Sequence, residues 1–482
     1  MSEYDPGKVI CSCARVTCGD IANAVAAGAK TVDDLREATR ATAFCGSCTD
    51  RVEAFLNDVL SGQAKPAAQP QQPAADPGQL VAPIFRQVCD DIWYVGASDR
   101  SADWFEKQYP VPDGMSYNSY LLLDRSTVLF DTVDQSVREV FLRSVETLLD
   151  GRPLDYLVIQ HMEPDHAATL GEVLRRWPKC QASCTAAAKK MIGQFFGPQL
   201  SGRVQEVRDG VSMMVGKHIL SFHTAPMVHW PEVMVTYDAA DKVLFSADAF
   251  GTFGALTGNI FADELDFERD WLDDARRYYA NIVGKYGVQV QTLLKKAAGL
   301  DIAYICPLHG PIWRENMGWF VEKYQTWSTY APEDKAVAIF CGSVYGHTEN
   351  AADIVANRLA EKGVKGIRLY DVSNTDVSEL VSEAFRCSHL VLASATYNGA
   401  IFTPMENFLL DLKAHNLQNR TVAVIDNGTW AATAGKQMRE IVGAMKNMTV
   451  LENGVSLKSS VKETQRAELE VLADTLAADI LA

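Results

Sequence analysis

The chain has 482 residues, a formal net charge of −16, and 48% hydrophobic against 22% charged residues. This balance excludes wholesale disorder, and the length predicts roughly two to four domains. An acidic surface disfavours nucleic acid and anionic membranes as partners, and no apolar run is long enough to span a bilayer. Because the first residues also lack the basic and apolar segments of a signal peptide, we expect a cytoplasmic protein.

Two changes in composition divide the chain. Residues 61–80 are rich in Pro, Ala and Gln, which is typical of a semi-extended tether. A second boundary lies near residues 330–335, where a helical pattern over 315–328 gives way to an apolar strand. We therefore expect a small module at 1–60, a flexible linker at 61–80, a second domain at 81–330 and a third at 335–482.

Four of the eleven cysteines form two close pairs near the N-terminus, Cys11 with Cys13 and Cys45 with Cys48. In a reducing compartment, clustered cysteines indicate a metal site in preference to disulfides. Four thiolates satisfy either a [2Fe–2S] cluster or a structural zinc ion. The C-x-C spacing of the first pair is unusual for zinc modules, which favours the cluster.

The residues between and after these pairs predict a small helical module. Residues 20–42 predict two short helices joined at Gly28, and residues 51–60 predict a third. The segment resembles bacterioferritin-associated ferredoxin and its relatives, which hold a [2Fe–2S] cluster. This resemblance implies that the four paired cysteines are the cluster ligands.

The second domain alternates apolar strands with helical patterns, which indicates a layered α/β fold. A helix is expected at 169–177. Strands are expected at 119–124, 127–133, 154–160, 218–226, 233–238, 242–250 and 302–310.

Seven potential metal ligands follow these strands, and all are histidines or carboxylates. Mixed imidazole and carboxylate ligands suit iron, manganese or zinc, and seven are too many for one ion but fit two ions with a bridging carboxylate. Chance is a poor explanation for seven ligands at strand ends, whereas isolated residues such as His389 and His415 are expected on the surface or in the core. The seven are His161, Glu163, Asp165, His166, His229, Asp248 and His309.

This domain resembles the metallo-β-lactamase-like domain of flavodiiron proteins, whose pattern is H-x-E-x-D-H followed by H, D and H at set intervals. The ligands that the resemblance implies are His161, Glu163 and His229 for one iron, Asp165, His166 and His309 for the other, and Asp248 as the bridge. The counterpart of His166 varies in its coordination within the family. Hydrolytic relatives carry a second histidine where this chain has Glu163, and the added negative charge favours a redox-active iron over zinc.

The third domain predicts a parallel, doubly wound sheet. Its apolar strands are expected at 336–342, 365–372, 389–396, 421–428 and 448–454, each followed by a stretch of helix length. In such a sheet, ligands bind at the switch point between the first and third strands. The complete chain is therefore expected to be a multi-domain α/β protein.

Three loops of the third domain favour a flavin site at that switch point. The small, hydroxyl-rich turn 343–350 opens a helix, where free N–H groups and the helix dipole attract anions. The loops 394–399 and 427–430 bring aromatic and small residues to the same sheet edge. The alternative is that these aromatics only cover apolar surface.

This domain resembles flavodoxin, whose ligand is FMN, over nearly all of residues 335–482. The residues that this resemblance implies around the phosphate are Ser343, Tyr345, Gly346, His347, Thr348 and Asn350. Those implied around the flavin ring are Thr396, Tyr397, Asn398, Gly399, Asn427, Gly428, Thr429 and Trp430. The last loop departs from the family, which often has a Gly-rich run with Trp at this place.

Together the resemblances imply a flavodiiron reductase. Electrons would pass from a donor through the [2Fe–2S] cluster and FMN to two non-haem irons, which reduce O2 to water and/or NO to N2O, with a slight preference for O2. The family also implies a head-to-tail homodimer or tetramer. The donor is unknown, because the sequence lacks a rubredoxin-type C-x₂-C-G pair at its C-terminus and a nicotinamide-binding G-x-G-x-x-G motif.

Two other functions fit parts of the pattern. One is a metallo-β-lactamase-like zinc hydrolase fused to a flavodoxin-like electron-transfer domain. The other is a non-enzymatic electron carrier with a vestigial metal site, which the complete set of seven ligands disfavours. Metal content and consumption of gas distinguish these alternatives from a reductase.

Overall fold

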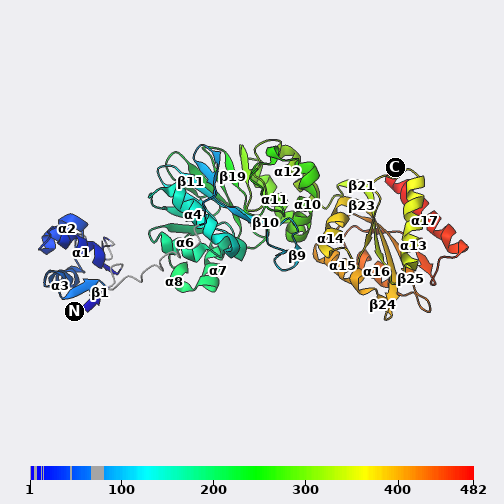
Figure 1. The fold of residues 1–482 in the computed structure, drawn as a ribbon, viewed down its shortest axis with the longest axis horizontal. Coiled ribbons are helices and arrows are strands. Elements are labelled where there is room, and N and C mark those ends of the chain that lie inside the picture. The colour runs from blue at the N-terminus through cyan, green and yellow to red at the C-terminus, as the bar shows by residue number, and fades with distance from the viewer. Residues whose placement is uncertain (1, 5–7, 12–13, 15, 44–45, 67–80) are drawn as a thin grey trace. The chain divides into compact units, whose positions relative to one another are not determined.

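The computed structural model describes residues 2–4, 8–11, 14, 16–43, 46–66 and 81–482 (Figure 1). Cys13, Cys45 and residues 67–80 of the expected linker lie outside this part of the chain. The chain divides into two compact units, Met1–Leu80 and Val81–Ala482, which are described one at a time.

The first unit contains the three expected helices, α1 (Cys18–Ala26), α2 (Val32–Thr39) and α3 (Thr49–Leu60). Thr17 and Thr31 begin α1 and α2 with capping boxes, in which each threonine side chain and an aspartate three residues later satisfy each other's backbone N–H. The helices enclose a small core that contains Ile21, Leu35 and Val52.

Short strands complete the first unit. β2 (Val9–Cys11) and β3 (Val16–Thr17) are antiparallel, and β1 (Ser2–Tyr4) pairs in parallel with β4 (Ala64–Pro66). Residues 64–66, at the start of the segment expected as a linker, therefore pair with the N-terminal strand.

The second unit begins with two sheets, and every strand expected in the middle domain is present. The first sheet has the order β15-β14-β13-β12-β11-β6-β5 and the second has the order β16-β17-β18-β19-β20. The strands of the first sheet are β5 (Arg86–Cys89), β6 (Ile92–Tyr94), β11 (Tyr120–Leu123), β12 (Thr127–Phe130), β13 (Tyr156–Val158), β14 (Gln181–Cys184) and β15 (Val204–Glu206). Those of the second are β16 (Ser212–Met214), β17 (Ile219–Thr224), β18 (Met234–Asp238), β19 (Val243–Phe245) and β20 (Tyr304–Cys306).

The two sheets pack face to face through apolar side chains. The rings of Phe130 and Phe245 stack with their centroids 3.7 Å apart, and the ring centroids of Tyr120 and Phe245 are 5.5 Å apart. Figure 1 shows helices on both sides of the pair of sheets, so this part is an αββα sandwich. The helices are α4 (Arg138–Leu149), α6 (Leu170–Arg176) and α7 (Ala186–Phe196) on one side, and α10 (Leu272–Tyr278), α11 (Gly287–Ala297) and α12 (Met317–Ser328) on the other.

The rest of the second unit is the expected doubly wound sheet. Its parallel strands are β22 (Arg368–Asp371), β21 (Asp334–Gly342), β23 (Cys387–Tyr397) and β25 (Thr421–Asn427), in that order across the sheet. Alternate residues of β21 face opposite sides: Val337 and Ile339 pack with one group of helices, and Ala338 and Phe340 with the other. The first group is α13 (His347–Glu361) and α17 (Glu463–Leu481), and the second is α14 (Val377–Arg386), α15 (Thr403–Ala414) and α16 (Ala434–Gly443).

The fifth strand differs from the prediction. The sequence predicts one strand at 448–454, whereas the structure has two short strands, β26 (Thr449–Val450) and β27 (Val455–Leu457), that both pair with β25. Between them the chain turns, with the N–H of Gly454 bonded to the carbonyl of Glu452 at 3.0 Å. Arg439 donates to the carbonyl of Leu451 at 2.6 Å and lies against Gly454, so it occupies the gap in the strand.

The sandwich and the doubly wound sheet are joined by buried polar contacts. Arg277 of α10 donates to the Ser378 hydroxyl at 3.1 Å, and the Asn281 amide donates to the Ser378 carbonyl at 3.1 Å. Arg420, which is 1% exposed, stands before β25, and all its hydrogen-bond acceptors among the described residues are backbone carbonyls. These carbonyls belong to Tyr330, Ala384, Phe385, Gln418 and Asn419.

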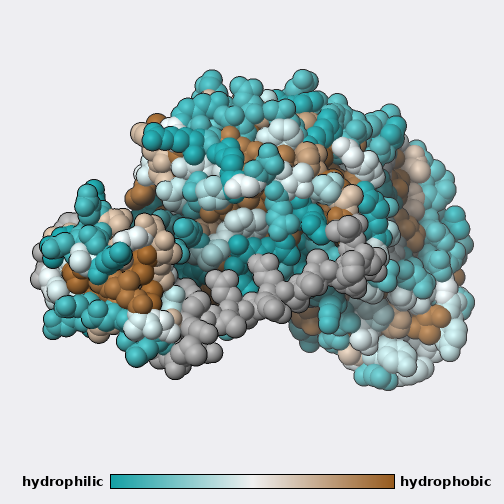
Figure 2. Space-filling view, turned by 60° about the vertical axis from the view of Figure 1, so that its left-hand side comes forward, coloured by the Kyte–Doolittle hydropathy of each residue, from teal (hydrophilic) through white to brown (hydrophobic). Residues whose placement is uncertain are grey.

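The face of the molecule in Figure 2 is mostly hydrophilic. Figure 2 shows hydrophilic residues over most of the face of the larger unit, with small apolar areas between them. Within the described part of the chain, no helix combines the length and the apolar character that a membrane span needs.

Candidate metal centre

The seven expected ligands lie together at one end of the two sheets. His161 and Glu163 follow β13, and Asp165 and His166 lie on the short helix α5 (Pro164–Ala167). His229, Asp248 and His309 come from the second sheet, in loops after β17, β19 and β20. Each of the seven is 9% exposed or less, so the cluster is buried.

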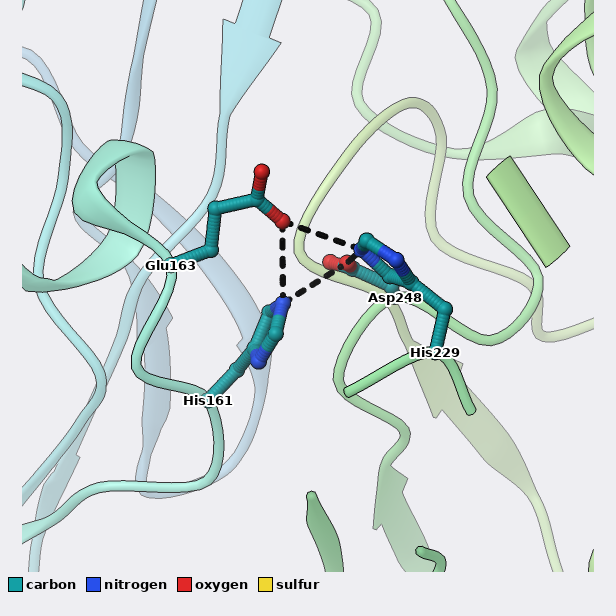
Figure 3. A group of neighbouring side chains, drawn as sticks. All are labelled: His161, Glu163, His229 and Asp248. Atoms are coloured by element: carbon teal, nitrogen blue, oxygen red, sulfur yellow. Dashed lines mark hydrogen bonds and ion pairs between the residues drawn. The ribbon is translucent and has the colours of Figure 1, made fainter. Parts of the chain in front are cut away.

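The first group of ligands consists of His161, Glu163 and His229 (Figure 3). An oxygen of Glu163 lies 3.2 Å from His161 Nε2 and 2.9 Å from His229 Nε2. Both imidazoles therefore point their Nε2 atoms at the Glu163 carboxylate. Three donor atoms placed in this way could bind one metal ion between them.

The second group consists of Asp165, His166 and His309. The Nε2 atoms of His166 and His309 lie 3.0 Å apart, and each is 3.1 Å from Asp165 Oδ2. His166, whose counterpart varies in the family, thus points its Nε2 at the same place as the other two residues.

Asp248 is shared by the two groups. Its Oδ2 lies 3.2 Å from the Nε2 atoms of both His161 and His229, while its Oδ1 lies 3.2 Å from His166 Nε2 and 3.9 Å from His309 Nε2. Donor atoms that share an ion through bonds of about 2.1 Å lie roughly 3.0–3.4 Å apart. The residues therefore fit two ions bridged by the Asp248 carboxylate.

The charges of the site also fit two cations. Burial alone would lower the pKa of His166, but the Asp165 and Asp248 carboxylates outweigh burial and raise it to about 10. Burial would raise the pKa of Asp248, yet His161 and His166 hold that pKa well below its usual value. Asp165 Oδ1 is buried and has no hydrogen-bond partner among the described residues. This end of the sandwich requires positive charge, which bound metal ions would supply.

Local structure holds the ligands in place. The N–H of His166 bonds to the Glu163 carbonyl at 2.9 Å in the first turn of α5, and Thr132 Oγ1 donates to the His166 carbonyl at 2.6 Å. Next to His309, Gly310 has a φ of 74° and donates its N–H to the Ser116 hydroxyl at 2.7 Å. A side chain at position 310 would collide with Thr252 at 2.1 Å, so this turn needs glycine.

Three neighbours of the site were not predicted from the sequence. Glu232 is 1% exposed and accepts a hydrogen bond from His161 Nδ1 at 2.9 Å. Tyr278 is fully buried, its ring lies 5.6 Å from that of His309, and its hydroxyl has no partner among the described residues. Glu106 is an exposed residue beside the site, and desolvation and then the neighbouring Glu163 carboxylate raise its pKa to about 8. The sequence offers no signal for Glu232 beyond its position three residues after His229.

Of the four paired cysteines, the structure describes two. Cys11 ends β2, Cys48 stands directly before α3, and both are buried. Burial and then the neighbouring Cys11 thiol raise the pKa of Cys48. The two thiols are thus neighbours in an apolar setting, where a cationic cluster would stabilise them as thiolates.

The turn expected at the FMN phosphate begins α13. Ser343 Oγ accepts the N–H of Gly346 at 3.0 Å, and Gly346 has a φ of 83°, a conformation that glycine adopts without strain. His347 is the first residue of the helix, Thr348 is buried in its first turn, and Asn350 bonds its N–H to the Gly346 carbonyl. Tyr345 is 89% exposed at the edge of the sheet.

The loop after β23 reaches the same edge as this turn. Thr396 Oγ1 accepts the N–H groups of Thr433 and Ala434 at 3.0 and 3.1 Å, which ties the loop to the start of α16. Asn398 and Gly399 have positive φ angles and turn the chain into β24 (Ala400–Ile401). Tyr397, which precedes this turn, is 50% exposed.

The loop after β25 completes the edge. Asn427 exchanges two hydrogen bonds with the backbone of Ser459, at 2.9 and 3.0 Å, and the Ser459 hydroxyl donates to Thr429 Oγ1 at 3.1 Å. Gly428 lies so close to Ala431 that a side chain there would meet its carbonyl at 2.1 Å. Trp430 is 92% exposed, so two large aromatics stand uncovered where a flat ring could lie.

Comparisons with known proteins agree with this architecture. The family model described as ODP family beta lactamase matches residues 115–310, and that of the BFD-like [2Fe-2S] binding domain matches residues 9–58. An anaerobic nitric oxide reductase flavorubredoxin of Escherichia coli (strain SMS-3-5 / SECEC) is 30% identical over 352 residues, which are 72% of this chain and 73% of the relative.

Solved structures extend the likeness to the fold. Rubredoxin oxygen:oxidoreductase from Desulfovibrio gigas is 29% identical, with a TM-score of 0.76 over 83% of this chain and 99% of that chain. The flavodiiron protein from Giardia intestinalis, 24% identical, shares the fold with a TM-score of 0.78 over 84% of this chain and 98% of that chain. From the sequence match to the flavorubredoxin and the shared fold, we conclude that this chain belongs to the flavodiiron protein family.

Proposed function

We propose that this chain is a flavodiiron reductase with FMN, two non-haem irons and a [2Fe–2S] cluster. It takes electrons from a donor and reduces NO to N2O, O2 to water, or both. The relatives support both gases, since one is named a nitric oxide reductase and another an oxygen oxidoreductase. When bound, FMN exchanges electrons singly or in pairs and the irons bind and reduce the gas.

The observation that carries this proposal is the position of Asp248 between two groups of three ligands. The residues proposed for one iron are the first group with Asp248, and those for the other are the second group with Asp248. The zinc hydrolase alternative rests on the β-lactamase-like match, which describes the fold of the sandwich. A carboxylate at Glu163, where hydrolytic relatives have histidine, favours a redox-active metal.

The remaining site residues are proposed from the resemblances and the positions of their loops. Cys11, Cys13, Cys45 and Cys48 would hold the [2Fe–2S] cluster. Ser343, Tyr345, Gly346, His347, Thr348 and Asn350 would surround the FMN phosphate. Thr396, Tyr397, Asn398, Gly399, Asn427, Gly428, Thr429 and Trp430 would hold the ring.

The function is tested by single-turnover measurements on the reduced protein. Full-length protein with two irons per chain is reduced without oxygen and mixed with NO or with O2 in a stopped-flow instrument. We expect reoxidation by at least one gas, with N2O detected when that gas is NO. Zinc in the purified centre, with no consumption of either gas, would contradict the proposal.

The N-terminal cluster is proposed to pass electrons to FMN. We expect Cys45→Ser, which removes one cluster thiolate, to lower turnover with the physiological donor by about tenfold or more while FMN and the two irons remain bound. The matched control is Cys180→Ser, which changes a buried cysteine outside the proposed cluster. Unchanged turnover in Cys45→Ser would show that electrons bypass the cluster.

A head-to-tail homodimer or tetramer is proposed because of where the flavin loops lie. They follow the carboxyl ends of β21, β23 and β25, whereas Arg420, at the amino end of β25, contacts Tyr330 at the end of the sandwich. An FMN at this edge would be better placed for the metal centre of another subunit. Specific activity that stays constant on dilution to monomers would contradict this arrangement.

The domain ranges and the location are proposed as well. Functional domains at 1–60, 81–330 and 335–482, joined by a linker at 61–80, fit the two family-model matches. A cytoplasmic location fits a cluster held by four thiolates, because a reducing compartment protects them from disulfide formation.

A further inference from the structure

The two metal positions have equal inner ligands but unequal surroundings. Each group contains two histidines and one carboxylate, and each shares Asp248. The contacts made by the other nitrogen of each histidine are one source of difference between the two ions.

In the first group, His161 is held by a buried carboxylate. His161 Nδ1 lies 2.9 Å from Glu232 Oε1, and both side chains are 0% exposed. The same oxygen accepts the N–H of Met162 at 2.8 Å, which fixes the carboxylate in place. A carboxylate accepts hydrogen bonds, so His161 carries its proton on Nδ1 and directs the lone pair of Nε2 toward the metal.

In the second group, neither histidine has such a partner. His309 Nδ1 donates to the backbone carbonyl of Ser116 at 2.6 Å, which is a neutral acceptor. His166 Nδ1 is buried and has no hydrogen-bond partner among the described residues. Thus a carboxylate accepts the Nδ1 proton of His161 in the first group. Among the described residues, no carboxylate does so for His166 or His309 in the second group.

The carboxylate changes what the imidazole does for the metal. A carboxylate that accepts the Nδ1 proton increases the basicity of Nε2 and places negative charge near the ion. Both effects stabilise the ion with the higher charge, and they act more strongly in a buried site than in water. The ion of the first group should then be easier to oxidise than the ion of the second.

We propose that Glu232 is a positioning residue that makes the two irons unequal, so that the first electron removed from the reduced pair leaves the iron of the first group. With two ferrous ions bound, the ion held by the first group would become ferric and give its electron to a one-electron oxidant such as ferricyanide, while the ion held by the second group would stay ferrous. The proposal rests on the diiron pair of the proposed function and adds the order in which its members are oxidised.

The first test is a redox titration of full-length protein with two irons, followed by EPR and by Mössbauer spectroscopy. Glu232→Gln keeps the shape of the side chain and an acceptor for His161 and Met162, but removes the charge. We expect the comproportionation constant, for forming the half-oxidised pair from the fully reduced and fully oxidised forms, to fall by about tenfold, because the charge that favours oxidation of one iron over the other is removed. An unchanged constant with both irons bound would overturn the proposal.

Asp238→Asn is the matched control. His218 Nδ1 lies 2.9 Å from Asp238 Oδ2, and both side chains are 0% exposed, so this pair copies the His161–Glu232 contact outside the seven proposed iron ligands. Because His218, Asp238 and Asp241 lie close enough together to hold an ion of their own, the metal content of this variant is measured as well. Asp238→Asn should leave the constant for forming the half-oxidised pair within about twofold of the wild-type value. Both variants lose a buried charge, so a general loss of stability would affect both of them.

A second test needs no substitution and covers the case in which Glu232→Gln loses iron. Crystals of half-oxidised wild-type protein are measured by anomalous diffraction across the iron K edge, which gives a separate edge energy for each iron. We expect the ferric edge at the iron bound by His161, and a ferric edge at the other iron, or equal edges, would refute the proposal. If the crystals hold iron but the protein consumes neither gas, the proposed function fails while the order of oxidation stands.

Discussion

Asp248→Ala is expected to remove both irons from the protein and to lower gas reduction by more than about 100-fold. Asp248 is the residue whose two carboxylate oxygens face both groups of ligands, Oδ2 toward the first and Oδ1 toward the second. Removing an outer contact of a metal ligand already costs about 10–100-fold in affinity or activity, so the loss of a shared inner ligand should exceed that range. Iron per chain, measured by mass spectrometry of the metal, is the direct readout.

The control for this substitution is Asp238→Ala. Asp238 is equally buried, lies in the second sheet of the same sandwich, and also pairs with a histidine. We expect this variant to keep two irons per chain even if its stability falls. Two irons retained in Asp248→Ala would show that Asp248 does not bridge them.

Arg420→Met is expected to destabilise the larger unit by about 3–5 kcal/mol. The guanidinium is buried and donates to five backbone carbonyls that come from the end of the sandwich, from α14 and from the turn before β25. Methionine fills similar space but donates no hydrogen bond, so several buried acceptors would lose their partners at about 1–3 kcal/mol each, partly offset by the release of a buried charge. Urea unfolding followed by circular dichroism measures the change.

Arg358→Met provides the comparison for Arg420→Met. Arg358 pairs with Asp474 at 2.7 Å on the surface between α13 and α17, with 30% of its side chain exposed. A pair of this kind contributes about 0–1 kcal/mol. If both variants unfold at the same urea concentration, the five carbonyl contacts of Arg420 do not hold the unit together.

The sequence was sufficient wherever a local pattern decides the structure. The central parallel strands of the doubly wound sheet are largely apolar runs, and the core of β21 falls where the run 336–342 predicted it. The candidate ligands were visible because four of them stand within six residues, from His161 to His166, directly after a strand. Parallel strands carry such residues to one edge, and the structure brings all seven together.

Contacts between distant residues were beyond the reach of the sequence. Glu232 meets His161 across 71 positions of the chain, and no periodic pattern marks that pairing. The same limit applies to the interrupted fifth strand of the doubly wound sheet, where Arg439 of the preceding helix contacts Leu451 and Gly454 at the interruption. Half of the cysteine motif lies on residues that the structure does not describe, so its assignment still rests on spacing and on the family.

The burial of the seven ligands sets a limit on the size of the substrate. Each ligand is at most 9% exposed, and the rings of Phe105 and Tyr117 lie 5.4 and 5.8 Å from that of His309. A diatomic gas would reach metal ions held by such buried ligands far more easily than a β-lactam or a peptide would. Steric exclusion of larger molecules would then give the proposed metal centre its selectivity for small gases.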